Sequence, residues 1–241
     1  MYHHQKVSVV LPVYNEAEGI AAVIEDFFSC PEVDEVVAVD NNSTDASAAE
    51  IRKTRAKYVF EPVQGYGSAL KRAMQEASGD IIITADSDST YFASDIEKLL
   101  AYSNEIDFVF GSRMSRSLIL PGAFMPLAVR LGNWAEAKML SCLFDGPTLT
   151  EVGCTFKLIK RAAFEKIKDS LTVKGPHFSP ELIIRAIQNG ISFVEIPVFY
   201  RPRVGQSKGA GDIWSAIKVG VKMGWLIWGE RFRSGKRVVE A

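Results

Sequence analysis

Short apolar runs alternate with segments of helical spacing along the first half of this chain, and this alternation constrains its fold more than any other feature. The apolar runs, rich in β-branched residues, cover residues 7–11, 36–39, 58–60, 81–85 and 108–110. Segments with the spacing of amphipathic helices lie between them, at residues 19–28, 46–53, 68–77 and 95–102. Near-continuous apolar strands that alternate with such helices form a parallel sheet covered on both faces. We therefore expect an α/β fold whose ligands bind at the carboxyl ends of the strands.

A polar or glycine-rich cluster follows each of the first four predicted strands. These clusters are Pro12-Val13-Tyr14-Asn15-Glu16, Asp40-Asn41-Asn42-Ser43-Thr44-Asp45, Gln64-Gly65-Tyr66-Gly67-Ser68 and Asp86-Ser87-Asp88. Taken singly, each cluster is also typical of a helix cap or a turn. Because parallel strands end at the same edge of a sheet, four such clusters together favour a nucleotide-binding site.

The cluster Asp86-Ser87-Asp88 carries the clearest chemistry, because it directly follows a buried strand. Mg²⁺ and Mn²⁺ prefer oxygen ligands and are commonly held by one or two carboxylates together with substrate phosphates. Gly65 and Gly67 do not form a dinucleotide-binding fingerprint, since the third glycine is missing and the pair does not follow the first strand. The sequence therefore predicts that carboxylates, strand-end loops and a divalent metal hold the diphosphate of a nucleotide.

Length and composition exclude several classes of protein. The 241 residues suffice for one large α/β domain or two small ones. The formal net charge of −1 gives no basic excess that would indicate nucleic-acid binding. Cys30, Cys142 and Cys154 lack the spacing of metal ligands, so we expect a reducing, cytoplasmic setting. We expect neither a signal peptide nor a membrane span, since no window has about 20 consecutive apolar residues.

Six stretches, in order along nearly the whole chain, resemble those of the family-2 glycosyltransferases with the GT-A fold, and in particular the dolichol- and polyprenyl-phosphate sugar synthases. The stretches are residues 9–16, 39–45, 79–88, 110–113, 178–182 and 203–208. The resemblance implies a GT-A type catalytic domain over residues 1–212, with a mostly parallel nucleotide-binding sheet flanked by helices. It also implies a Mg²⁺ or Mn²⁺ cofactor and a GDP- or UDP-linked sugar as donor.

The same resemblance implies a set of donor-binding residues. The set comprises Pro12, Tyr14, Glu16, Asp40, Gly65, Gly67, Asp86 and Ser207. Its first three members would enclose the nucleoside, and Asp40 would hydrogen-bond the base, whether uracil or guanine. Asp86 would reach either the ribose or the metal.

A second set would carry the chemistry of transfer. Its members are Asp88, Arg113, Glu151, Glu181, Arg203 and Lys208. Asp88 would ligate the metal that bridges the donor diphosphate. Arg203, Ser207 and Lys208 would close over the diphosphate and the acceptor phosphate, since two cations and a hydroxyl suit phosphate groups.

The acceptor decides whether a catalytic base is required. A lipid monophosphate is largely anionic at neutral pH and needs cationic positioning, which the resemblance assigns to Arg113 and Arg130. A sugar hydroxyl must lose a proton, and Glu151 and Glu181 are then the candidate bases. The chain departs from the family pattern after Glu151, where Thr155 replaces a glycine. That departure concerns the sugar and the acceptor more than the fold.

The carboxyl-terminal segment, residues 213–241, joins an apolar helix to a basic tail. Tryptophans at positions 214, 225 and 228 precede Arg231, Arg233, Lys236 and Arg237. This composition is typical of a helix at a membrane surface, although packing on the catalytic domain or a homodimer contact is an alternative. Residues 127–144 form a second helix-like stretch rich in Leu, Ala and Met.

The leading hypothesis is a metal-dependent, inverting transferase at the cytoplasmic face of a membrane. It would move mannose or glucose from a nucleotide-diphosphate sugar to a polyprenyl or dolichyl phosphate. The first alternative is the same donor chemistry on a soluble or saccharide hydroxyl, with a glutamate base. The second is a sugar nucleotidyltransferase, which requires a glycine-rich loop after the first strand that residues 12–16 do not supply. A non-catalytic binder of nucleotide sugars is the third.

Overall fold

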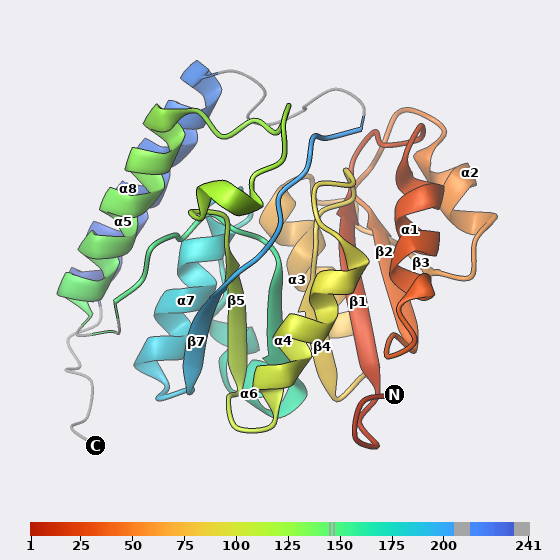
Figure 1. Cartoon of the computed structure of the whole chain (residues 1–241), viewed down its shortest axis with the longest axis horizontal. Helices are drawn as coiled ribbons and strands as arrows, with labels where there is room; N and C mark the ends of the chain where they lie inside the picture. The colour runs from red at the N-terminus through yellow and green to blue at the C-terminus, as the bar shows by residue number, and fades with distance from the viewer. Residues whose placement is uncertain (145, 147, 205–212, 234–241) are drawn as a thin grey trace.

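A seven-stranded sheet, flanked by helices, forms the centre of the computed structural model, which describes residues 1–144, 146, 148–204 and 213–233 (Figure 1). The strand order is β3-β2-β1-β4-β6-β5-β7. Among the described strands, only β6 runs antiparallel to its neighbours, which are β4 and β5. The strands are β1 (Val7–Val13), β2 (Glu35–Asp40), β3 (Lys57–Phe60), β4 (Ile81–Thr84), β5 (Phe108–Ser112), β6 (Lys157–Lys160) and β7 (Phe193–Pro197).

Helices connect the strands and cover both faces of the sheet. They are α1 (Ile20–Ser29), α2 (Ser47–Arg52), α3 (Tyr66–Glu76), α4 (Ile96–Ser103), α5 (Leu127–Leu143), α6 (Arg161–Ile167), α7 (Phe178–Gln188) and α8 (Ile213–Arg233). Single 3₁₀ turns lie at Ala93–Asp95, Arg116–Leu118 and Lys168–Ser170. Every strand and helix predicted in the first half overlaps one of these elements. The predicted α/β fold with a mostly parallel sheet is therefore confirmed.

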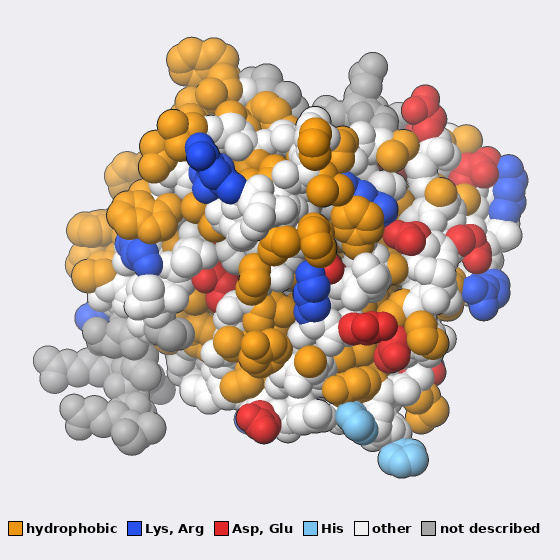
Figure 2. Space-filling model, viewed as in Figure 1, with side chains coloured by type: hydrophobic (Ala, Val, Ile, Leu, Met, Phe, Trp, Pro, Cys, Tyr) orange, Lys and Arg blue, Asp and Glu red, His pale blue; other side chains and the backbone are white. Residues whose placement is uncertain are grey.

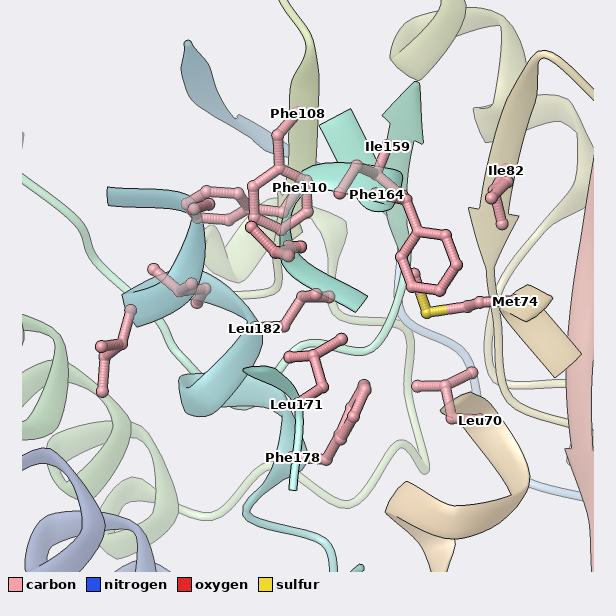
Figure 3. Close-up of a cluster of buried hydrophobic side chains, with 14 of the residues drawn as sticks. Leu70, Met74, Ile82, Phe108, Phe110, Ile159, Phe164, Leu171, Phe178 and Leu182 are labelled. Carbon is pink, nitrogen blue, oxygen red and sulfur yellow. The ribbon is translucent and has the colours of Figure 1, made fainter. Parts of the chain in front are cut away.

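Alternating strand residues point into two separate cores. On one face, Val10 and Ile82 join apolar side chains of α3, α6 and α7 (Figure 3). On the other face, Val9 and Ile83 pack against α1 and α4. These aliphatic side chains are fully buried, and each such burial contributes about 1.5–3 kcal/mol relative to exposure. The two cores hold the strand ends in fixed register, which is what a site at their edge requires.

Helices α5 and α8 lie side by side at one flank of the molecule and begin near the carboxyl edge of the sheet (Figure 1). Met223 and Ile227 anchor α8 in the core, and an Arg185–Glu230 ion pair of 2.8 Å joins it to α7. The opposite side of α8 is exposed. The predicted apolar carboxyl-terminal helix is not confirmed, because charged residues give α8 a mixed character. Among the described helices, none combines the length and apolarity that crossing a bilayer requires.

Candidate functional site

A pocket of about 1160 Å³ opens at the carboxyl edge of the sheet. The loop after β1, the start of α3 and the residues after β4 form one end of it, and α5 and α8 form the other. We call these the nucleotide end and the helical end. Eight of the predicted site residues line the pocket, namely Pro12, Tyr14, Glu16, Gly65, Asp86, Asp88, Arg113 and Arg203. Residues that are distant in the sequence therefore meet in one cavity.

Asp86 is held by hydrogen bonds to both of its carboxylate oxygens. The Tyr66 hydroxyl donates to Oδ1 at 3.1 Å, and the Thr155 hydroxyl donates to Oδ2 at 2.6 Å. Burial, and after it the negative charge of Asp88, raises the pKa of Asp86 to about 6. The carboxylate is thus oriented, and a nearby cation would stabilise its ionised form.

Asp88 and Glu16 share one arginine. Asp88 Oδ1 accepts hydrogen bonds from the backbone N–H of Thr90 at 3.1 Å and from its hydroxyl at 2.6 Å. Asp88 Oδ2 lies 3.3 Å from Arg203 Nε, while Arg203 Nη2 donates to Glu16 Oε1 at 2.8 Å. The guanidinium therefore joins the loop after β1 to the residues after β4, and it places a positive charge next to Asp88.

The residues at this edge fit a divalent cation. Asp86 and Asp88 lie two residues apart in the pocket, their mutual repulsion contributes to the raised pKa of Asp86, and Asp88 already faces a cationic group. Within the described part of the chain, no cluster of three His, Cys, Asp or Glu residues has the arrangement of a metal site. A metal here would thus take its remaining ligands from a diphosphate and water, as Mg²⁺ commonly does.

Two glycines at the start of α3, Gly65 before it and Gly67 in its first turn, allow two backbone segments to meet. Gly65 has φ of +148°, and a Cβ there would lie 2.3 Å from the carbonyl oxygen of Lys174. A Cβ on Gly67 would lie 2.4 Å from the carbonyl oxygen of Val173. Gly65 lines the pocket and Gly67 does not. The close approach explains why glycine is required at both positions.

Asp40 lies beside the pocket rather than in its wall. Its oxygens accept hydrogen bonds from the backbone N–H of Ser43 at 3.0 Å and the hydroxyl of Tyr58 at 3.3 Å. The next residue, Asn41, lines the pocket, and its side-chain oxygen accepts a hydrogen bond from Gly65 N–H at 2.7 Å. Asn41 is therefore the side chain from the end of β2 that a nucleoside in the pocket would meet.

Glu151 and Glu181 are both buried and lie outside the pocket lining. Glu151 forms an ion pair with Arg113 and also accepts its backbone N–H at 2.6 Å. Glu181 accepts hydrogen bonds from the backbone N–H groups of Thr172 at 2.9 Å and Val173 at 3.0 Å. Each carboxylate thus holds protein groups in place and is not presented to a substrate in the pocket.

The remaining predicted residues are distributed differently. Arg130 donates to the carbonyl oxygen of Met114 at 3.0 Å and does not line the pocket, whereas Arg113 does. Ser207 and Lys208 lie outside the described residues. The sequence assigned no role to Tyr66 or Thr155, and the structure shows that both donate hydrogen bonds to Asp86. Asn133 and Glu136 of α5 also line the pocket, and no sequence motif had indicated them.

Comparison with solved structures shows the class of fold. Glucosyl-3-phosphoglycerate synthase from Mycobacterium tuberculosis, in complex with Mn²⁺, UDP and phosphoglyceric acid, aligns with a TM-score of 0.72. The alignment covers 95% of this chain and 78% of that chain at 20% sequence identity. Similarity at this level concerns the fold, which is of the GT-A-like α/β type.

The sequence comparisons then identify the family. Residues 8–168 match glycosyl transferase family 2. The dolichyl-phosphate hexose transferase of Haloferax volcanii is 31% identical over 86% of this chain and 88% of its own length. The low-salt glycan biosynthesis hexosyltransferase Agl6 of the same organism is 34% identical over 83% of this chain, which spans only 49% of Agl6. The chain belongs to glycosyl transferase family 2, and the prediction of a glycosyltransferase is confirmed.

Proposed function

We propose that this enzyme transfers a hexose, mannose or glucose, from a GDP- or UDP-linked donor to a polyprenyl or dolichyl phosphate, with inversion at the anomeric carbon. The observation that carries the proposal is the convergence of Asp86, Asp88 and Arg203 in a pocket whose far end is apolar. The dolichyl-phosphate hexose transferase of Haloferax volcanii, which this chain matches over most of both lengths, supports the lipid acceptor.

In this proposal, Asp86 and Asp88 would hold Mg²⁺ or Mn²⁺, and the bound metal would supply positive charge that stabilises a departing nucleoside diphosphate. Arg203 contributes a second positive charge to the same group, since charge-assisted hydrogen bonds from guanidinium suit phosphate oxygens. Ser207 and Lys208 remain proposed diphosphate contacts from the neighbouring segment. Pro12, Tyr14, Glu16 and Asn41 enclose the nucleoside.

The acceptor phosphate attacks the anomeric carbon through one of its anionic oxygens. The new C–O bond forms on the face opposite the bond to the diphosphate, which leaves with the electron pair of that bond. No proton has to be removed from the nucleophile, because a phosphate monoester is already ionised. Arg113, which lines the pocket, is the proposed contact for this phosphate, and Arg130 supports the loop beside it.

A hydroxyl acceptor is the second candidate, and it requires a carboxylate base near the nucleophile. The internal contacts of Glu151 and Glu181 leave neither carboxylate available for that task. This arrangement favours the phosphate acceptor over a hydroxyl acceptor that depends on either residue. A sugar nucleotidyltransferase is disfavoured by the family match.

The helical end supports an acceptor that resides in a membrane. Large apolar side chains are exposed along α5 and α8, including Leu131 and Trp134 on the first helix and Trp214, Trp225 and Phe232 on the second. Figure 2 shows apolar side chains gathered on this flank of the molecule. We propose that this surface, which we call the α5–α8 surface, rests on the cytoplasmic face of a lipid bilayer. A homodimer contact is the alternative occupant.

The test uses the purified protein with Mn²⁺ or Mg²⁺ and a panel of radiolabelled UDP- and GDP-hexoses. One set of reactions contains a polyprenyl phosphate in detergent, and a matched set contains a soluble glycoside. We expect label in the organic-solvent fraction with one donor. Label that enters only the soluble glycoside would establish the hydroxyl alternative, and label in neither would refute transfer to both acceptors.

A further inference from the structure

Glu136 is a charged residue at the helical end of the pocket that none of the roles above uses. It lies on α5 in the stripe formed by Val129, Gly132 and Glu136, which lines the cavity. Facing it, α8 contributes Ile217, Gly220 and Val221 to the lining. The carboxyl group therefore stands among apolar and small residues.

Gly220 of α8 leaves space for this carboxyl group. A Cβ at Gly220 would lie 3.0 Å from Glu136 Oε1, a separation tighter than side chains normally accept. Glycine at this position lets α8 pass next to the carboxyl group without displacing it. Burial raises the pKa of Glu136 to about 7, so near neutral pH the group both accepts and donates hydrogen bonds.

Glu136 has no hydrogen-bond or ion-pair partner among the residues that the structure describes, whereas its neighbour in the pocket is engaged. Asn133 Oδ1, one turn earlier, accepts the backbone N–H of Gly153 at 3.1 Å. Glu136 is half-buried and lines the pocket. Its carboxyl group is therefore presented to a ligand there, and a ligand hydroxyl would complete its hydrogen bonds.

The proposed ligands offer only one suitable group. The nucleoside lies at the nucleotide end, and the diphosphate lies at Asp86, Asp88 and Arg203. The acceptor phosphate is assigned to Arg113, and a polyprenyl chain carries no hydrogen-bonding groups. The hexose follows the diphosphate in the donor and has several hydroxyl groups. Resting on the proposed function, we infer that Glu136 binds a hydroxyl group of the transferred hexose and so contributes to the choice of sugar.

The test separates binding of the hexose from binding of the nucleotide. Calorimetry with Mn²⁺ measures the Kd of the nucleoside diphosphate and of the matching nucleotide hexose, and the ratio of the two gives the contribution of the hexose. We expect Glu136→Ala to lower this contribution about tenfold or more, as loss of a hydrogen bond to a carboxylate does. The Kd of the nucleoside diphosphate should stay within about twofold, since the nucleotide end is intact.

Two variants and one control sharpen the result. Glu136→Gln keeps the shape and part of the hydrogen bonding, so it should retain part of the hexose contribution. Gly220→Ala displaces the same carboxyl group from the opposite helix, and it should lower the hexose contribution while Glu136 is still present. Glu97→Ala, an exposed position on α4, should change neither Kd.

Three outcomes would overturn the inference. An unchanged hexose contribution in Glu136→Ala would show that the carboxyl group does not touch the sugar. Unchanged donor affinity combined with a large fall in turnover on a hydroxyl acceptor would assign it to a base instead. If the wild-type protein binds neither UDP nor GDP with Mn²⁺, the proposed function fails first, and the inference fails with it.

Discussion

The two ends of the pocket are built in opposite ways. At the nucleotide end, short loops leave rigid strands, and Asp86, Asp88 and Arg203 each contact a protein group. At the helical end, two helices present apolar side chains, and Glu136 has no partner within the described chain. A hydrogen-bonded end holds its ligand groups in one geometry before a ligand arrives. An apolar end gives shape and burial instead, which suits a flexible chain. In our proposal, the nucleotide and its diphosphate bind at the first end, and the hexose and the lipid acceptor extend toward the second.

The largest effect should come from the nucleotide end, with Asp88→Asn. This change removes the charge but keeps the shape and one acceptor oxygen for Thr90. Loss of a metal contact to the departing diphosphate should lower turnover about 10²-fold or more. The melting temperature should change little, because the hydrogen-bonding shape survives. Asp107→Asn, before β5 at the opposite edge of the sheet, is the matched control. Near-normal turnover and unchanged Mn²⁺ dependence in Asp88→Asn would show that Asp88 does not hold a metal.

Arg203 tests whether the cation at the nucleotide end serves the ligand or only the protein. Arg203→Ala should lower kcat/KM for the donor about 10- to 100-fold, since charge-assisted hydrogen bonds of this kind contribute about 1.5–3 kcal/mol. Arg203→Lys keeps the charge but lacks the planar guanidinium group. Its kcat/KM should therefore lie between those of the wild-type protein and Arg203→Ala. Steady-state kinetics at varied donor concentration measures kcat/KM for the three proteins. Equal kcat/KM in all three proteins would leave Arg203 as a link between Glu16 and Asp88 alone.

Thr155 tests how strongly the nucleotide end is preorganised. Thr155→Val keeps the volume but removes the hydroxyl that donates to Asp86 Oδ2 at 2.6 Å. We expect the affinity for the nucleoside diphosphate with Mn²⁺ to fall about tenfold, since the oriented carboxylate loses one of its two supports. Thr155→Ser should restore most of the affinity, because it returns the hydroxyl. If Thr155→Val binds the nucleoside diphosphate as tightly as the wild-type protein, the hydrogen bond to Asp86 does not contribute to affinity.

Substitutions on the α5–α8 surface should weaken binding to lipid and leave nucleotide binding unchanged. Replacing Trp214 and Trp225 with alanine removes two aromatic side chains that are 71% and 72% exposed. Binding to anionic liposomes, followed by flotation, should fall several-fold, because interfacial binding scales with the apolar area buried. The affinity for the nucleoside diphosphate should not change. An unchanged liposome fraction with a shift from dimer to monomer in light scattering would identify a protein contact instead.

The two ends also differ in how far the sequence predicts them. Asp86, Asp88 and Glu16 could be placed in one site because parallel strands end at a common edge. Glu136 could not, since its position depends on how α5 packs against α8, and no local pattern encodes that packing. The contacts of Glu181 could not be predicted for a similar reason: they depend on the backbone of Thr172 and Val173, which folds back onto α7. The direction of β6 likewise follows from tertiary pairing with β4 and β5.

Calorimetric titration of UDP and GDP into the wild-type protein, with and without Mn²⁺, tests the central claim most directly. If Asp86 and Asp88 hold a metal that bridges the diphosphate, one nucleotide should bind with Mn²⁺ at least about tenfold more tightly than without it. The same titration on Asp88→Asn should show this difference reduced or lost. A nucleotide that binds equally well with and without Mn²⁺, in both proteins, would contradict a metal–diphosphate site at the end of β4.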